Sequence, residues 1–326
     1  MRILVTGSTG YLGEALVRTL RAANHDVRGI DILPSAHTDR VGSVSDRAFV
    51  MAAMAGMDAV IHSATLHKPH VATHTKQDFI DTNVTDTLTL LECAAECGAN
   101  RFIFTSTTSA FGAALSPEDG MPAAWITEEV RPIPKNIYGT TKTAAEDLCA
   151  LFHRKHGLSC LVLRTARFFP EEDDNKDVRA VYDDTNAKIN EFLFRRVDLE
   201  DVVSAHLCAL DKAPALGFGR YIISATSPFT REDLADLRRD AANTVRRYVG
   251  FDACFDKFGW SMFPSIDRVY VNERARSALG WRPRFDFHRV LEQADRGEPI
   301  GSGLARLIGK KGYHPVAFED GPYPVE

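Results

Sequence analysis

The sequence predicts an α/β fold: a doubly wound parallel sheet with helices on both faces, and a smaller, discontinuous C-terminal lobe. Short apolar runs alternate with longer segments of helical periodicity through the first half of the chain, which is the pattern of a layered α/β protein. The apolar runs are continuous, as expected for parallel strands that are buried on both faces. After residue 164 this alternation of apolar runs and helical segments ends, and we place the boundary between the sheet and the lobe shortly after this point.

Five strands are expected in the first half, at residues 2–6, 26–30, 59–62, 101–106 and 159–164. Four helices connect them, at residues 11–23, 46–55, 79–97 and 137–156. A helix at about 198–210 and a strand at 221–223 indicate a late return of the chain to the sheet. We therefore assign residues 1–169 plus 196–224 to the sheet domain.

Residues 170–195 plus 225–326 are assigned to the lobe, which we expect to lie over the strand ends and to bind substrate. Short helices are expected at about 231–241, 273–279 and 288–295. Residues 170–190 show little periodicity, and their acidic run is expected to be a solvated loop: Glu171, Glu172, Asp173 and Asp174. The proline-containing tail from Gly309 is predicted to be an extended surface strap.

The composition of the 326-residue chain excludes several classes of protein. A net charge of −5 disfavours a nucleic-acid binder or a basic membrane-surface protein. No apolar run is long enough to span a membrane, and the N-terminus, already a strand, lacks a secretory signal pattern. None of the six cysteines forms a CxxC pair, so a reduced, cytoplasmic protein is expected.

A glycine-rich loop, GSTGYLG, joins the first strand to the first helix. Its glycines allow a tight turn and a close approach of the backbone to a pyrophosphate, while the helix N-terminus supplies N–H donors and a positive dipole end. The spacing therefore predicts a dinucleotide site. The expected cofactor contacts in this loop are Gly7, Thr9, Gly10, Tyr11, Leu12 and Gly13.

An acidic residue ends the second strand. Asp31 stands 18 residues after Gly13, where a carboxylate can hold the diol of a ribose. The same carboxylate would repel a 2′-phosphate, so NAD is favoured over NADP. The sheet domain is therefore predicted to be a Rossmann-type, NAD-binding domain.

A tyrosine and a lysine follow in the segment YGTTK, at Tyr138 and Lys142. Their four-residue spacing puts both on one helix face, where the ammonium group lowers the tyrosine pKa from about 10. Lys142 can also reach the nicotinamide ribose, so both residues are expected cofactor contacts. Thr107 ends the fourth strand and can hydrogen-bond a substrate oxygen. We predict that these three residues are catalytic and assist hydride transfer at a secondary alcohol carbon.

These motifs resemble the extended short-chain dehydrogenase/reductase superfamily, and within it the NAD-dependent epimerase/dehydratase family. The segment NVTDTLTLLECAAECGANRFIFTST, residues 83–107, is similar to the family's helix and fourth strand, and LGWRP at 279–283 is similar to a later family marker. The resemblance covers nearly the whole chain. It implies an NAD-dependent enzyme that acts on a carbohydrate, with a nucleotide sugar favoured.

The resemblance also implies cofactor contacts outside the glycine loop. His62, Ser63 and Ala64 match the family's loop after the third strand, which passes the adenosine and the phosphates. Ser43 and Val44 lie in the segment from which the family reaches the adenine, although Ser43 replaces the usual aspartate. The family often pairs through the helices matching residues 79–97 and 137–156, so a homodimer is expected.

Candidate substrate contacts follow the strands. Thr108 comes directly after the catalytic threonine, and His67 lies in the loop after the third strand. Three arginines near the expected cleft could clamp a phosphate or a carboxylate: Arg164, Arg167 and Arg196. In nucleotide-sugar enzymes of the family an arginine grips the diphosphate. Here Phe194 takes that place, with Arg195 and Arg196 immediately after it.

No metal site is expected. His67, His70 and His74 share one loop, but no acidic or cysteine partner is close in sequence, and Pro69 interrupts any regular helix. We interpret the segment as a polar loop or a substrate contact.

Three functions stay open. The first is an NAD-dependent epimerase or dehydratase of a nucleotide sugar. The second is an NAD-dependent dehydrogenase of a free sugar, a sugar acid or a polyol, because the diphosphate-gripping arginine is displaced. The third is a non-catalytic NAD sensor, which would not require Tyr138 and Lys142.

Overall fold

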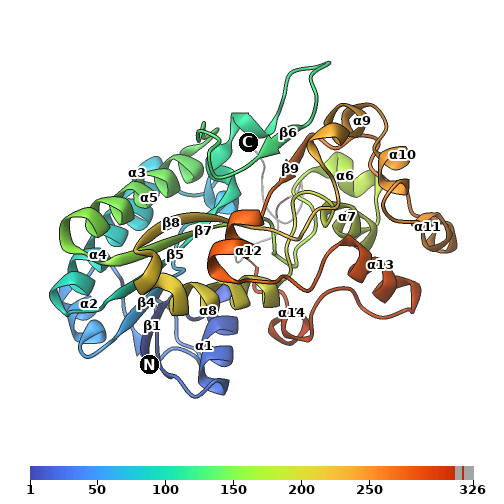
Figure 1. The fold of residues 1–326 in the computed structure, drawn as a ribbon. Coiled ribbons are helices and arrows are strands. Elements are labelled where there is room, and N and C mark those ends of the chain that lie inside the picture. The colour runs from blue at the N-terminus through green and yellow to red at the C-terminus, as the bar shows by residue number, and fades with distance from the viewer. Residues whose placement is uncertain (313–317, 319–326) are drawn as a thin grey trace.

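A seven-stranded parallel sheet forms the centre of the protein in the computed structural model, which describes residues 1–312 and 318 (Figure 1). Every neighbouring pair of strands in it is parallel. Across the sheet the strands run in the order β3 (Arg40–Val41), β2 (Asp26–Asp31), β1 (Arg2–Thr6), β4 (Ala59–His62), β5 (Arg101–Thr107), β7 (Ser159–Thr165) and β8 (Phe218–Ile223). The predicted doubly wound fold is confirmed.

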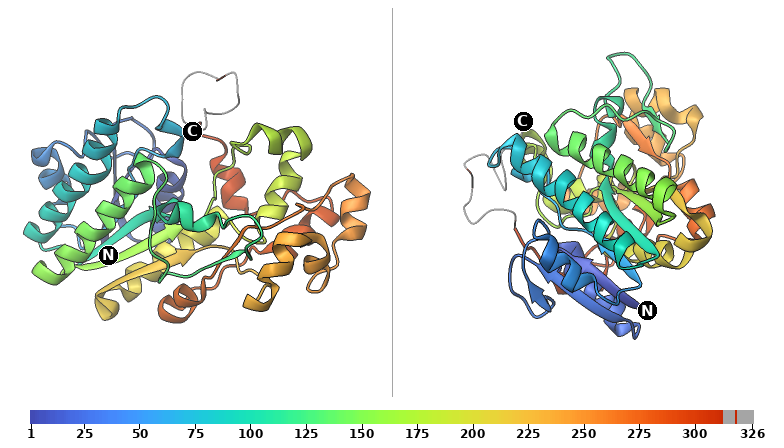
Figure 2. Two further views of the ribbon diagram at one scale, coloured as in Figure 1. Left: turned by 90° about the horizontal axis from the view of Figure 1, so that it is seen from above. Right: turned by 90° about the vertical axis from the view of Figure 1, so that its left-hand side faces the viewer.

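Two helical layers cover the sheet because alternate strand residues point to opposite faces. Ile3 and Val5 belong to an apolar cluster with α1 (Tyr11–Ala22) and α8 (Leu199–Leu216). Leu4, between them, belongs to a second cluster on the other face. That face is covered by α2 (Arg47–Met54), α4 (Asp86–Glu96) and α5 (Ile137–His156). Figure 2 (right) looks onto the layer formed by α4 and α5.

The helix predicted at residues 79–97 is wrong in its start and its continuity. The chain enters α3 (Lys76–Ile80) through a capping box at Thr75, passes through a π-helical turn (Asp81–Thr85), and only then continues as α4. The π turn contains Asn83, whose buried side chain bonds residues outside the helix. Such a turn marks a place where a tertiary contact outweighs regular helical geometry.

The lobe has an apolar core of its own, which draws on residues 187–194 and 225–294. Figure 2 (left) shows most of its helices beside the sheet domain. They are α6 (Lys176–Val181), α7 (Asp184–Glu191), α9 (Leu234–Arg239), α10 (Ala241–Arg246), α11 (Asp252–Phe258) and α13 (Phe287–Asp295). The prediction of little regular structure at 170–190 was wrong, because Asn175 and Asp183 cap α6 and α7. Most of the predicted strap from Gly309 lies outside the described residues.

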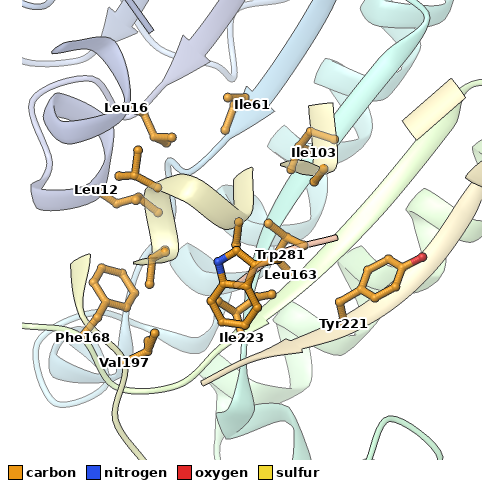
Figure 3. Packing of buried hydrophobic residues seen from close by; sticks show 14 of the residues in the cluster. Leu12, Leu16, Ile61, Ile103, Leu163, Phe168, Val197, Tyr221, Ile223 and Trp281 are labelled. Atoms are coloured by element: carbon orange, nitrogen blue, oxygen red, sulfur yellow. The ribbon is translucent and has the colours of Figure 1, made fainter. Parts of the chain in front are cut away.

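Two connections tie the lobe to the sheet domain. A small parallel sheet pairs β6 (Ala124–Ile126) with β9 (Arg268–Tyr270). After α12 (Glu273–Leu279), Trp281 packs into the sheet-domain core near Leu163 and Ile223 (Figure 3). The Trp281 indole donates to the carbonyl of Asp201 in α8 at 3.0 Å. The last described helix, α14 (Gly303–Ile308), also reaches this core.

Among the described residues, no helix has both the length and the hydropathy needed to cross a bilayer. All six cysteines are free thiols, and four of them are buried. The cytoplasmic location inferred from them stays a prediction.

Candidate active site

A cavity of about 760 Å³ opens at the carboxyl ends of β1, β2, β4, β5 and β7. This is the edge at which open α/β sheets bind their ligands. The cavity runs without interruption from the glycine-rich loop to Tyr138 and on to the segment after β7. One end therefore suits a cofactor and the other a substrate.

The glycine-rich loop forms the first wall. Gly7 has a φ of +72°, and a Cβ added there would meet the amide nitrogen of Ala64 at 2.9 Å. A Cβ added at Gly13 would lie only 1.9 Å from the carbonyl oxygen of Gly7. Within the described structure no side chain caps α1 at Gly10, so its first amides are available to a pyrophosphate. This loop, called the glycine cradle below, therefore has the geometry that suits the pyrophosphate of a dinucleotide.

Asp31 lies at the edge of this cradle and is held in place by three N–H or O–H donors. The amide and the hydroxyl of Thr9 donate to one carboxylate oxygen at 3.0 and 2.7 Å, and the amide of Leu33 donates to the other at 3.0 Å. The carboxylate lines the cavity. Ile32 and Leu33, which sequence reasoning missed, extend this wall as exposed apolar side chains. Their position directly after Asp31 in the sequence could have identified them.

Ser43, Val44 and His62 do not line the cavity, in contrast to the prediction. The hydroxyl of Ser43 bonds that of Ser45 at 2.7 Å, and Val44 packs against the apolar cluster under α2 and α4. His62 is buried between the hydroxyls of Thr6 and Thr87. Burial, with a smaller effect of Lys142, lowers the pKa of His62 to about 3.

Ser63 and Ala64 lie beside the glycine loop, as expected for the segment after β4. Ser63 lines the cavity and donates its hydroxyl to the carbonyl of Thr6 at 2.6 Å. The amide of Ala64 donates to the hydroxyl of Thr6 at 3.1 Å. These bonds hold the Ala64 backbone against Gly7.

The structure brings Thr107 and Tyr138 together. Thr107 ends β5, and Tyr138 lies in the first turn of α5, whose start is fixed by a hydrogen bond from the Gly139 amide to Asn136. Burial raises the pKa of Tyr138 to about 12, although an interaction with Thr107 opposes this rise, so the lowering of this pKa expected from Lys142 is not borne out. Both side chains line the cavity. A hydroxyl pair of this kind can hold the oxygen of an alcohol and exchange its proton.

Lys142 lies one helical turn behind Tyr138 and is 2% exposed. Its ammonium group lies 4.1 Å from the ring centroid of Phe104, a cation–π contact, and does not itself line the cavity. Burial lowers the pKa of Lys142 to about 7, although the carboxylate of Glu146 opposes this shift. The lysine therefore gives up its proton far more readily than an exposed one.

Arg164 is not a substrate contact in this structure, which corrects the prediction. It is 2% exposed and makes a two-pronged ion pair with Glu146, at 2.7 Å for the shortest contact. Ser106 and Arg220 bond the same carboxylate. Because β7 turns this side chain toward α5, Arg164 joins the sheet to α5 instead of facing the cavity.

His67 and Thr108, which are predicted to contact the substrate, both line the cavity. The ring centroid of His67 lies 6.3 Å from that of Tyr138, and burial lowers the pKa of His67 to about 3, so the ring is neutral near pH 7. Asn83, missed as a site residue, fixes the loop before His67. Its side chain bonds the amide and carbonyl of Leu66 and the hydroxyl of Thr141 in α5, at 2.9, 3.1 and 3.1 Å.

The far end of the cavity carries a cluster of paired charges, here called the arginine–carboxylate cluster. It consists of Arg167, Arg195, Arg196, Asp173, Asp174 and Glu191. Arg167 contacts Asp173 and Asp174 at 3.1 and 3.2 Å, and Arg195 contacts Asp173 and Glu191 at 2.7 Å each. The prediction of a solvated acidic run was wrong for Asp173 and Asp174, which make these ion pairs, and for Glu171, which is buried; Glu172 is exposed.

Two predicted arginines thus differ in position. Arg167 lines the cavity, whereas Arg196 bonds Glu191 at 2.7 Å and lines a second cavity of about 590 Å³ against the lobe. Phe194, at the place of the family's diphosphate-gripping arginine, is buried in the lobe core. Within the described part of the chain, no group of three His, Cys, Asp or Glu side chains is arranged to hold a metal ion.

Comparison with known proteins decides the family. The model of the NAD dependent epimerase/dehydratase family matches residues 3–223. The chain belongs to this family. It is therefore an NAD-dependent enzyme, as the sequence motifs predict.

Relatives within and near this family differ in the substrates that their names indicate. A UDP-glucose 4-epimerase of Corynebacterium glutamicum is 23% identical over 90% of this chain and 94% of its own length. Sterol demethylase protein B of Methylococcus capsulatus is 27% identical over 91% and 90%. A short-chain dehydrogenase/reductase superfamily protein of Agrobacterium tumefaciens, solved with bound NAD, has a TM-score of 0.65 at 24% identity, covering 91% and 96%.

The cofactor end of the cavity fits NAD, the cofactor of this epimerase/dehydratase family. The glycine cradle admits a backbone-bound pyrophosphate, and Asp31 stands where a ribose diol would lie. The continuous cavity then leads to the Thr107–Tyr138 pair.

Proposed function

We propose that this enzyme oxidises a secondary alcohol carbon of a carbohydrate, with Tyr138 moving the hydroxyl proton. The observation that carries the proposal is that Thr107 and Tyr138 line the same cavity and interact with each other, one helical turn from Lys142. A non-catalytic NAD sensor would not need this arrangement.

NAD supplies the hydride acceptor when it is bound. Thr107 holds the substrate oxygen by hydrogen bonding and keeps it beside the Tyr138 hydroxyl. Lys142, behind the tyrosine, stabilises the tyrosinate that receives the alcohol proton. Asn83 maintains the loop that closes this side of the cavity by tying Leu66 to α5.

Two courses follow from oxidation. In an epimerase or dehydratase the hydride returns to the substrate and NAD stays bound, whereas in a dehydrogenase NADH leaves. Relatives named UDP-glucose 4-epimerase support a nucleotide sugar as substrate. The ion pairing of Arg167 and Arg195 supports the second candidate, a free sugar or polyol, because these arginines are already engaged by carboxylates.

The test compares Tyr138→Phe with Tyr182→Phe, a control in the lobe. We expect Tyr138→Phe to lower the rate of alcohol oxidation by roughly 10²- to 10⁴-fold, measured by NADH absorbance and by chromatography of the sugar. NAD affinity, measured by calorimetry, should be retained. Full activity of Tyr138→Phe would remove the proposed mechanism, and absence of NAD binding by the native chain would remove the proposed function.

We also propose a homodimer that pairs through α4 and α5. Leu151 on α5 is 38% exposed, and Leu88 and Leu148 are only partly buried against the sheet domain. Leu151→Asp should convert the dimer to a monomer in light scattering. Leu307→Asp, on the distant α14, is the matched control. A native chain that is monomeric by light scattering contradicts the proposal.

A further inference from the structure

We propose that the substrate is an uncharged polyhydroxyl compound, a free sugar or polyol, whose hydroxyl groups are bound by Glu171. This inference rests on the proposed function, and it names the substrate class of the same cavity. It depends on three observations: paired cations, an unpaired carboxylate and aromatic walls.

The cations that line the far part of the cavity are already neutralised. Lys68 pairs with Asp174 at 2.5 Å, Arg167 with Asp173 and Asp174, and Arg195 with Asp173. Three further cations that line the cavity have partners too: Arg268 with Asp267, Lys311 with Glu14, and exposed Lys135 with the hydroxyl of Ser116. A diphosphate would thus meet no cation in the far part of the described cavity that lacks a carboxylate partner.

These pairs are poorly placed to exchange a carboxylate for a phosphate. Glu191 is 1% exposed, and Asp173 is buried as well. Withdrawing Arg195 toward a ligand would weaken the pairing of both buried carboxylates, and an uncompensated buried charge is strongly unfavourable. The arginines therefore act as internal partners of the acidic run and not as anion receptors.

Glu171 is the buried member of this acidic run for which the described residues provide no ion-pair partner. It lines the cavity and is 8% exposed, and its Oε2 atom is buried without a hydrogen-bond donor among the described residues. A carboxylate accepts several hydrogen bonds, so it calls for O–H or N–H donors from a ligand. The carboxylate would repel a diphosphate. Against an apolar steroid it would lose its hydrogen bonds to water and gain none in exchange.

Aromatic side chains line the same cavity as this carboxylate. Phe168 and Phe169 stack with ring centroids 4.5 Å apart, and both line the cavity together with Tyr270. Mostly apolar walls with a few placed polar groups are the usual design of a small-molecule site. A sugar suits both the aromatic wall and the carboxylate, because its C–H face packs on the aromatic rings while its hydroxyl groups donate hydrogen bonds to Glu171.

The experiment uses the full chain loaded with NAD. Its probes are D-galactose, D-glucose and myo-inositol as neutral polyols, UDP and UDP-glucose as diphosphates, and a 3β-hydroxysteroid as an apolar alcohol. Binding is measured by calorimetry, and turnover by NADH absorbance and sugar chromatography. We expect binding and Tyr138-dependent turnover of at least one neutral polyol and no binding of UDP at millimolar concentration.

Glu171→Gln and Glu171→Ala test the recognition step. We expect a rise in KM for the polyol of roughly 10- to 100-fold, the range for a hydrogen bond to a charged group, with NAD affinity unchanged. Glu172→Gln removes the same charge from the exposed neighbour and should change neither value.

Four outcomes overturn the inference: binding of UDP, turnover of UDP-glucose or of the steroid, no binding of any polyol, or a Glu171→Ala variant with native KM. If the chain binds NAD and turns over UDP-glucose through Tyr138, only the substrate class fails. If the chain does not bind NAD, the proposed function fails first.

Discussion

The two ends of the cavity are built in different ways. The cofactor end depends on backbone geometry and one carboxylate, all within the first 31 residues: Gly7, Gly13 and Asp31. The substrate end depends on side-chain ion pairs between segments far apart in the sequence, such as Lys68 with Asp174. A motif can encode the first end, whereas only the folded chain assembles the second. The cofactor can therefore be predicted from the sequence, whereas the substrate cannot.

The largest effect is expected at the cofactor end. Gly13→Ala places a Cβ 1.9 Å from the Gly7 carbonyl oxygen, so the cradle must open. We expect NAD affinity to fall by at least 100-fold, about 2.7 kcal/mol, in a calorimetric titration. Gly250→Ala is the control, because a Cβ there meets nothing within 4 Å. Equal NAD affinity in both variants would show that the cradle is not the cofactor site.

The next prediction concerns the substrate end, where a substitution should lower the stability of the fold without changing NAD affinity. Glu191→Gln removes the carboxylate that pairs with Arg195 and Arg196, and breaking a buried pair costs about 3–5 kcal/mol. Denaturant unfolding measures this loss, with NAD affinity expected to be retained. Glu292→Gln, on the exposed face of α13, should cost no more than about 1 kcal/mol.

The ion pairs of Glu191 also predict that the stability of the protein depends on pH. Burial alone would raise the pKa of Glu191, but Arg195, Arg167 and Arg196 outweigh burial and hold that pKa well below its usual range. A depressed pKa in the folded state stabilises the protein above the ordinary pKa, and this contribution is lost as the pH falls toward the folded value. The gap between native and Glu191→Gln stability should therefore narrow in acid. A gap that widens would contradict the ion pairing.

A smaller, graded effect is expected in the catalytic pH profile. Burial raises the pKa of Tyr138 to about 12 and lowers that of Lys142 to about 7. The active pair, tyrosinate with ammonium, carries the same number of protons as the neutral pair, so its fraction is constant between these values. Below about pH 7 the lysine gains a proton while the tyrosine keeps its own, and this fraction falls.

We therefore expect kcat/KM for alcohol oxidation to fall about tenfold per unit below pH 7 and to be level above it, up to about pH 9. Initial rates of NADH formation across this range measure the profile. Lys142→Met should abolish the step near pH 7, and NAD affinity over the same range is the control. A native rate that keeps rising through pH 9 would assign the step to the tyrosine alone.

The sheet and helix α5 could be predicted because their signals are local. β1, β4 and α5 have the predicted bounds, since continuous apolar runs, an Asn136 cap and a terminal Gly157 fix them within the segment itself. The same holds for the glycine loop and Asp31, whose spacing follows from the turn between strand and helix.

The rest is set by partners far away in sequence. β3, β6 and β9 have two or three residues each and form only because a neighbouring strand is present. Arg164 and Arg167 are alike in sequence, yet one pairs with Glu146 in the core and the other faces the cavity. Glu171 and Glu172 are adjacent, yet one is buried and the other exposed. Which partner a charged residue meets is decided by tertiary packing.

The pairing of β6 with β9 bears on how this enzyme could be re-engineered. Residues 124–126 leave the sheet domain to complete the lobe, while Trp281 returns from the lobe to the sheet-domain core. Each part thus contributes residues to the core or the sheet of the other. Dividing the chain after Ile223 would therefore expose apolar residues in both parts. Transplanting a relative's lobe onto this chain as a single cassette should yield an insoluble chimera. Grafting must carry the 124–126 strand, the 167–196 segment and the Trp281 region together.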